Sequence, residues 1–176
     1  MRRCGHSPIS PPLKFLRSFD CSSKAGIVTV GWQPPHGTEP PMPPTLLTHD
    51  WAMSYPMTTR SVPVARIQAR RRLTGWNWAG DIEDAVLVAS ELVANAAVHA
   101  KVPGHQLWLR LRELENNELI VEVSDPVPAF PVPGRQGPGG ERGRGLRVVA
   151  ALAEELDWFL RAELGKTVRA RLGTVG

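Results

Sequence analysis

The sequence is poor in cysteine, and its two cysteines, Cys4 and Cys21, both lie near the amino terminus. They have neither the spacing of zinc ligands nor the number that a disulfide framework requires. Long apolar runs are also absent, since no stretch approaches the roughly 18 residues that a membrane-spanning helix needs. The basic start Met1-Arg2-Arg3 is followed by prolines instead of the apolar core of a signal peptide. A soluble cytoplasmic protein is therefore expected.

A strong excess of charge is absent too, because the net charge is only +4 and no basic arm stands out. The one local excess of positive charge runs from Arg60 to Arg72, with no acidic residue before Asp81. Such a stretch could face nucleic acid or an acidic protein. No motif that reads nucleic acid accompanies it, so a solvated helix face is the favoured interpretation and no direct nucleic-acid contact is expected.

Proline divides the chain into two parts. Residues 1–49 are rich in proline, glycine and serine, which predicts a disordered tail. Residues 50–174 carry the regular hydrophobic patterns, and with 42% hydrophobic residues in the whole chain they can form one globular domain. We therefore expect a tail followed by a single domain.

The hydrophobic periodicity of this domain predicts helices and strands in the order α-α-β-β-loop-α-β-β, with room for a short strand before them. Ser61 is expected to cap the first helix, and Gly75 to end it. The expected elements are a strand at 50–57, helices at 61–74, 81–100 and 147–155, and strands at 107–112, 119–125, 156–162 and 167–172. This order predicts an α+β two-layer sandwich, with helices on one face of a mixed, mainly antiparallel sheet.

The central helix, 81–100, carries three polar residues at a spacing of four. Glu91, Asn95 and His99 therefore project from one face, each one turn above the last. A carboxylate, an amide and an imidazole along the edge of an apolar helix are compatible with a solvated face or with a functional site. For His99, a packing or capping role is favoured over a catalytic one.

Further polar and glycine positions follow in a fixed order. The motif Glu-Leu-Val-x-Asn-Ala-x-x-His-Ala at 91–100 is followed by Val-Ser-Asp at 123–125 and by Gly-Arg-Gly-Leu at 143–146. Over residues 53–172 this pattern resembles the GHKL superfamily of ATP-binding domains, which gyrase, heat-shock-90-type chaperones, histidine kinases and MutL-type proteins share. It is most similar to the free-standing anti-sigma-factor serine kinases of actinomycetes. The resemblance implies the Bergerat-type ATP-binding fold.

The resemblance also implies a role for each motif residue. Asn95 would ligate the Mg²⁺ that bridges the phosphates of ATP, because an amide oxygen is a suitable hard ligand. Glu91 would orient or deprotonate the attacking hydroxyl. Asp125 would accept a hydrogen bond from the exocyclic amine of adenine. The remaining expected contacts with the nucleotide come from the lid residues Gly143, Gly145 and Leu146, and from Thr167 near the adenine.

One feature departs from the family pattern. A glycine-containing motif commonly follows the adenine-binding acid, whereas Pro126, Val127 and Pro128 follow Asp125 here. Lys166 is expected to be solvated.

The leading hypothesis is an anti-sigma factor that uses Mg²⁺-ATP to phosphorylate an antagonist protein, with a sigma factor as a second partner. The alternative is a non-catalytic interaction module of the same fold; monomer and homodimer both remain open.

Overall fold

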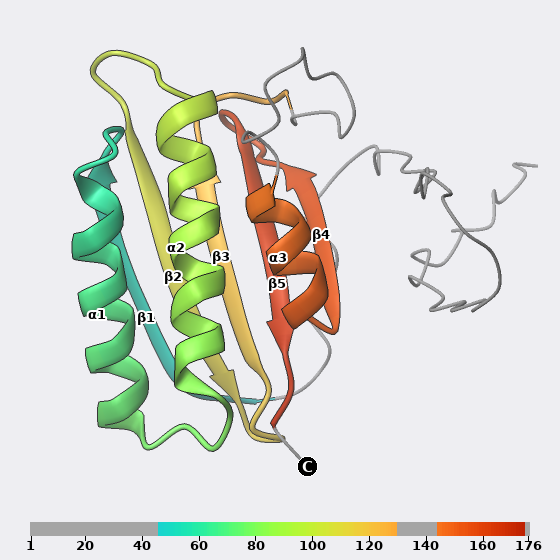
Figure 1. Ribbon diagram of the computed structural model, residues 1–176. Helices are drawn as coiled ribbons and strands as arrows, with labels where there is room; N and C mark the ends of the chain where they lie inside the picture. Colours follow the sequence, from blue (N-terminus) through green and yellow to red (C-terminus); the bar gives the residue numbers. More distant parts are fainter. Residues whose placement is uncertain (1–45, 130–143, 175–176) are drawn as a thin grey trace, which may run out of the picture. The chain divides into compact units, whose positions relative to one another are not determined.

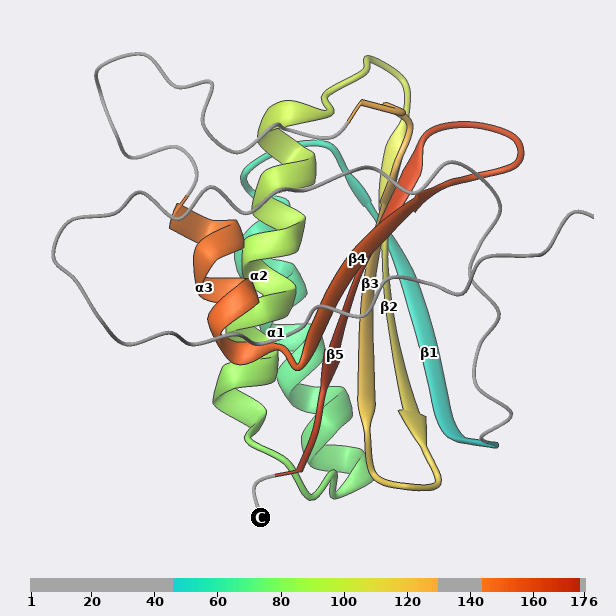
Figure 2. The same cartoon turned by 90° about the vertical axis from the view of Figure 1, so that its right-hand side faces the viewer.

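The computed structural model describes residues 46–129 and 144–174, which form a five-stranded sheet with helices on one face (Figure 1). Seen from the side, the helices and the sheet are two separate layers (Figure 2). The strands are β1 (Leu47–Pro56), β2 (Gln106–Leu114), β3 (Leu119–Asp125), β4 (Glu155–Leu160) and β5 (Lys166–Leu172), and the helices are α1 (Ser61–Trp76), α2 (Ile82–His99) and α3 (Arg144–Leu152).

The sheet has the strand order β1-β2-β3-β5-β4, and all four of its strand pairs are antiparallel. The predicted α+β class and the predicted two-layer arrangement are therefore confirmed. Strand β5 lies between β3 and β4, so the end of β3 meets the start of β5. In this register Asp125 is the partner of Lys166.

Alternation along the strands builds the core between the layers. Leu107, Leu109 and Leu111 are fully buried beneath the helices, as their period of two predicts. Val121 on β3 and Ala170 on β5 continue the same apolar layer and are also fully buried. The apolar face of the sheet therefore determines which side the helices cover.

Helix α1 differs from the sequence prediction at both ends. Ser61 is its first residue instead of its cap, and the Ser61 hydroxyl donates a hydrogen bond to the Pro56 carbonyl at 2.7 Å. Gly75 lies within the helix and does not end it. The helix ends at Asn77, which adopts the left-handed conformation with φ of 54°. Asparagine tolerates this conformation, so it can replace glycine as the terminating residue.

Helix α2 begins as the sequence predicts. The Asp81 carboxylate accepts hydrogen bonds from the backbone N–H groups of Glu83, at 2.8 Å, and Asp84, at 3.0 Å. The apolar residues Ile82, Ala85, Val86, Ala89, Leu92, Val93 and Ala96 recur at helical spacing, and of these only Ile82 is partly exposed. The buried residues of the helix are Ala85, Val86, Val88, Ala89, Ser90, Leu92, Val93, Ala96 and Ala97. This wider burial arises because α2 packs against α1 and α3 as well as the sheet.

The other boundaries shift by a few residues. Strand β1 begins at Leu47 rather than at Asp50, and α3 covers 144–152 rather than 147–155. Trp78, in the connection between α1 and α2, is buried, and its indole N–H donates to the Asn117 carbonyl at 2.8 Å. The predicted tail, apart from its last residues, and most of the 126–145 loop lie outside the described residues. No helix in the described ranges is long and apolar enough to cross a membrane.

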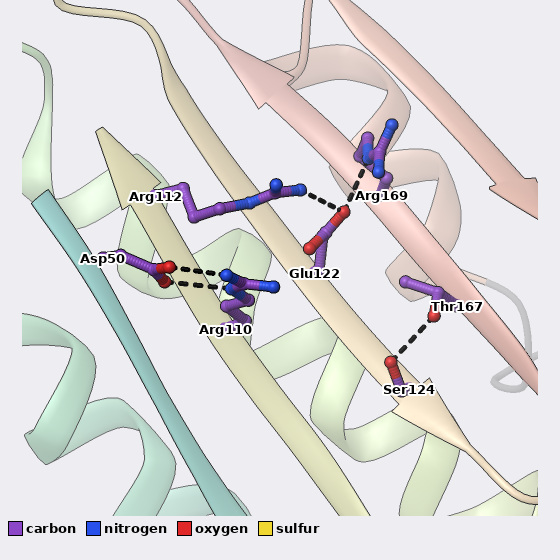
Figure 3. Close-up of polar contacts among 7 residues, drawn as sticks. All are labelled: Asp50, Arg110, Arg112, Glu122, Ser124, Thr167 and Arg169. Atoms are coloured by element: carbon purple, nitrogen blue, oxygen red, sulfur yellow. Dashed lines mark hydrogen bonds and ion pairs between the residues drawn. The ribbon is translucent and has the colours of Figure 1, made fainter. Parts of the chain in front are cut away.

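The sheet face away from the helices carries a network of charged side chains (Figure 3). Glu122 Oε1 accepts hydrogen bonds from Arg112 and Arg169, each at 2.6 Å, and all three residues are buried. Burial lowers the pKa of the Arg112 guanidinium, and the attraction of Glu122 opposes this shift. Arg110 on β2 pairs with Asp50 on β1. We refer to Arg112, Glu122 and Arg169 as the outer triad.

Candidate functional site

The helical spacing of Glu91, Asn95 and His99 places them along one edge of α2, as predicted. Glu91 and Asn95 are half-buried, and His99 in the last turn is exposed. Because an α-helix rises 1.5 Å per residue, about 12 Å separates the first residue from the last. This edge of α2 can therefore serve an elongated ligand with chemically different ends.

The first turn of α3 packs against this edge of α2, and Gly145 makes the contact. A Cβ atom on Gly145 would collide with the Glu91 carboxylate, and it would lie 3.7 Å from Asn95 Nδ2. A larger residue at this position would therefore require the Glu91 side chain to move. The backbone at the start of a helix carries free N–H groups that favour negative charge. A carboxylate, an amide and a helix start are thereby brought together from segments 50 residues apart in the chain.

The Asn95 side chain has unused hydrogen-bonding capacity. Its Nδ2 atom is buried and has no hydrogen-bond partner in the described part of the protein. A buried polar group without a partner is costly, and such groups in native proteins call for an explanation. A bound ligand would supply the missing partner. The amide can also present its oxygen, a hard ligand of the type that Mg²⁺ takes.

Asp125 ends β3 in a buried position beside Lys166. The Lys166 ammonium donates to Asp125 Oδ1 at 2.9 Å and lies 2.8 Å from Oδ2. The Val127 N–H donates to Oδ1 at 2.9 Å, so the chain turns around the carboxylate at the Asp-Pro step. Burial raises the pKa of the Asp125 carboxyl above its usual range, and the hydrogen bond and charge of Lys166 oppose this rise.

A small pocket lies between α2, the start of α3 and the ends of β3 and β5. Its lining residues are Leu92, Asn95, Ala96, His99, Val123, Asp125, Leu146, Lys166 and Val168. Its volume is about 20 Å³, whereas sites for small molecules typically measure roughly 300–1,000 Å³. The predicted site residues Asn95, Asp125 and Leu146 therefore meet at one pocket, which must widen to admit a nucleotide.

Four predicted site residues do not line this pocket. Glu91 and Gly145 form the contact between α2 and α3 described above. Thr167 faces the opposite side of the sheet, where its hydroxyl lies 2.8 Å from the Ser124 hydroxyl (Figure 3). Gly143 lies outside the described residues. The prediction that Thr167 reaches the adenine end finds no support in this orientation, because successive residues of a strand point to opposite faces.

Lys166 is the pocket residue that the sequence analysis missed. Expected to be solvated, it is only 4% exposed. The signal was present in the sequence, because Val168, Ala170 and Leu172 point inward, and a period of two places Lys166 inward as well. The positive charge of Lys166 instead favoured the interpretation that its side chain faces solvent. A lysine can be buried at this position because Asp125 supplies the opposite charge.

The described residues contain no group of three or more His, Cys, Asp or Glu that could hold a metal ion. This does not conflict with Asn95 as the predicted metal ligand, because Mg²⁺ in nucleotide sites takes one or two protein ligands and completes its shell with phosphate oxygens and water.

Comparison with known proteins agrees with the motif pattern. The family model described as a histidine kinase-like ATPase domain matches residues 56–172, which is more than half of the chain. No curated protein gives a significant match. Among solved structures, the crystal structure of the RsbU and RsbW domains of Rv1364c from Mycobacterium tuberculosis aligns with a TM-score of 0.53 at 20% sequence identity.

The alignment covers 73% of this chain but only 35% of the Mycobacterium tuberculosis chain, so the likeness concerns one part of a larger protein. At this level of identity the likeness shows a shared fold. The family model is the stronger evidence, because its match includes all three helices and all the strands except most of β1. The chain belongs to the family of histidine kinase-like ATPase domains.

Proposed function

We propose that this protein binds Mg²⁺-ATP between α2 and the start of α3, and that it is a regulatory kinase of the anti-sigma-factor type. The observation that carries the proposal is the contact of Gly145 with Glu91 and Asn95. This contact brings together a carboxylate, an amide whose buried nitrogen has no partner among the described residues, and the start of a helix. The chain that carries these groups belongs to the histidine kinase-like ATPase domains. A triphosphate with its cation needs this combination of groups.

Each residue has a distinct task in this proposal. Asn95 would hold Mg²⁺ against the phosphates, and the backbone at Gly145 and Leu146 would close over them. Asp125 would recognise the adenine amine at the other end of the pocket. Bound Mg²⁺ would neutralise charge on the phosphates. Glu91, one turn from Asn95, would accept the serine proton as the serine oxygen bonds to the γ-phosphorus and the bond to the β-phosphate breaks.

The partners follow from the same proposal. The acceptor would be a serine of an antagonist protein, and a sigma factor would be the protein held in check. Support comes from the motif resemblance and from the fold shared with a structure that contains an RsbW domain. Phosphorylation of the antagonist would then decide which of the two partners is bound.

The first experiment is calorimetric titration of the full chain with ATP and ADP, with and without Mg²⁺. We expect binding that depends on Mg²⁺ and is lost in Asn95→Ala. The matched control is Asn116→Ala in the β2–β3 turn, where the exposed side chain accepts a hydrogen bond from Glu118 N–H. It should bind like the wild type. Absence of binding by a folded wild type would refute the proposal.

The catalytic part needs a second experiment. Transfer of labelled γ-phosphate to a candidate antagonist protein should be lost in Glu91→Gln, while calorimetry shows ATP binding retained. Full transfer by this variant would exclude Glu91 as the proton acceptor. Loss of binding together with transfer would instead show that Glu91 helps to build the pocket.

The second candidate function is a non-catalytic interaction module, and one observation favours it. The Lys166 ammonium already forms an ion pair with the Asp125 carboxylate, which would recognise adenine, and the pocket is small. In this case the fold would contact proteins without turning over nucleotide. Nucleotide titration of the wild type separates the two candidates directly.

A further inference from the structure

The ammonium of Lys166 is fully engaged inside the protein. Its Nζ atom donates hydrogen bonds to Asp125 Oδ1 and to the Val127 carbonyl, each at 2.9 Å, and lies 2.8 Å from Asp125 Oδ2. The side chains of Lys166 and Asp125 are 5% and 3% exposed. Two hydrogen bonds and the ion pair with the carboxylate therefore compensate the buried positive charge. The Lys166–Asp125 interaction is therefore a buried, hydrogen-bonded ion pair.

The same contacts use most of the acceptor capacity of Asp125. Oδ1 accepts from both the Val127 N–H and Lys166, and Oδ2 faces the ammonium. An adenine amine is a neutral donor, whereas the Lys166 ammonium also carries a positive charge and forms an ion pair with the carboxylate. A base that approaches Asp125 therefore competes with a stronger donor that belongs to the protein.

The backbone beside Lys166 holds this lysine at the pocket. Gly165 has φ of +80°, and a Cβ there would lie 2.7 Å from the Cα of Pro126. The β4–β5 turn thus packs directly on the chain that leaves Asp125. Because the backbone is fixed by this packing, Lys166 can leave Asp125 only by a change in its side-chain rotamers.

We propose that Lys166 is an internal competitor for the base-recognising carboxylate, so that ATP binds only when the Lys166 ammonium releases Asp125. This inference rests on the proposed ATP site and adds a residue that sets its affinity and its preference for the base. Release of the lysine also widens the pocket, since its side chain forms part of the lining.

The test measures Mg²⁺-ATP affinity by calorimetry for the wild type, Lys166→Met and Lys166→Gln. We expect both variants to bind at least tenfold more tightly than the wild type. Glutamine retains one donor for Asp125 and so protects the fold against an isolated buried carboxylate, which the methionine variant leaves behind. The matched control is Arg161→Gln on the same turn, which removes a positive charge from an exposed side chain. It should change the affinity by less than twofold.

Tripolyphosphate, which has no base, tests where the gain arises. Its affinity with Mg²⁺ should be the same in the wild type and both Lys166 variants, because only the base competes with the lysine. An equal gain for tripolyphosphate and ATP would overturn the inference, and so would unchanged or weaker ATP binding in the variants.

The outcomes separate this inference from the proposed function. Wild-type binding that depends on Asn95, with no gain in the Lys166 variants, overturns the inference alone. No binding by any folded protein overturns both. Binding by the variants and none by the folded wild type refutes nucleotide binding by the wild-type protein, but it supports the inference that Lys166 blocks Asp125.

A measurement on the wild type covers the case in which both Lys166 variants fail to fold. The enclosed ammonium should give a slowly exchanging ¹⁵N–¹H signal in NMR spectra, and saturating Mg²⁺-ATP should remove it. Either a missing signal in the free protein or its persistence in the complex would overturn the inference.

Discussion

Two groups of buried charges lie on opposite faces of the same sheet and differ in what surrounds them. The outer triad joins Arg112, Glu122 and Arg169 across three neighbouring strands, away from the helices. The Asp125–Lys166 pair lies at the strand ends on the helix side and lines a pocket. Burial of charge therefore does not by itself mark a candidate site. The second group differs from the first because it lines a pocket beside the buried Asn95 Nδ2 atom, which has no partner among the described residues.

The largest effect is expected from breaking the outer triad. Glu122→Gln removes the negative charge that both arginines share and leaves the buried Arg112 guanidinium poorly compensated. The free energy of unfolding should fall by about 3–5 kcal/mol, the range for breaking a buried ion pair, as chemical denaturation would measure. ATP affinity of the remaining folded protein should stay within twofold. A loss of affinity without a loss of stability would mean that the outer triad belongs to the nucleotide site.

Gly165→Ala should disrupt the pocket side almost as strongly. Its positive φ strains any L-residue, and the new Cβ would collide with the Asp125 carbonyl oxygen. A loss of roughly 3 kcal/mol in the free energy of unfolding is expected from strain and backbone displacement. Gly75→Ala is the matched control, because nothing lies within 4 Å of a Cβ there and the residue is helical. It should raise stability by about 0.5–1 kcal/mol.

Gly145→Ala should separate ligand binding from stability. The methyl group would collide with the Glu91 carboxylate and displace it from its position beside Asn95. We expect Mg²⁺-ATP affinity to fall about tenfold, equivalent to about 1.4 kcal/mol, while thermal stability changes little because alanine favours the helix. Calorimetry and thermal unfolding on the same samples would test this. Unchanged affinity would show that the contact is not part of the binding site.

The smallest effect concerns Asp157 on the outer face of β4. Burial raises the pKa of its carboxyl to about 6, although Arg169 partly opposes the shift. Because the folded pKa exceeds the unfolded value, the folded state binds more protons, and Asp157 lowers stability as pH rises from about 4 to about 6. Asp157→Asn should remove this slope and gain on the order of 1 kcal/mol at pH 7, after allowance for its partial exposure.

Denaturation curves of the wild type and Asp157→Asn at several pH values would check this prediction. The pKa of Asp125 is also raised, so Asp125 contributes the same pH dependence of stability to the wild type and to Asp157→Asn. Only the difference between the two curves reports Asp157. Parallel curves across this pH range would contradict the prediction.

The sequence predicted most of the fold because its signals are local. Alternating leucines in β2 and the apolar stripe of α2 repeat with the periods of a strand and a helix, and both are buried as expected. The errors at Ser61 and Gly75 concern helix ends, where several residue types can fill the same role. Asn77 ended α1 because asparagine, like glycine, adopts a positive φ.

The site was predictable only in part. The spacing of Glu91 and Asn95 placed both on one edge of α2, since that relation depends on helical geometry alone. The contact of Gly145 with this edge needed the packing of α3 on α2. Thr167 was expected at the adenine end from the family resemblance alone, whereas in the structure its hydroxyl lies beside the Ser124 hydroxyl on the outer face of the sheet.

The sequence by itself determined the alternating and helical patterns, and therefore the two layers and the edge of α2 that carries Glu91 and Asn95. Only the tertiary structure decided that Lys166 pairs with Asp125, 41 positions earlier, and that Glu122 is shared by Arg112 and Arg169. The physical reason is that burial changes the cost of a charge. A lysine that water would solvate must find a carboxylate once the sheet register turns it inward.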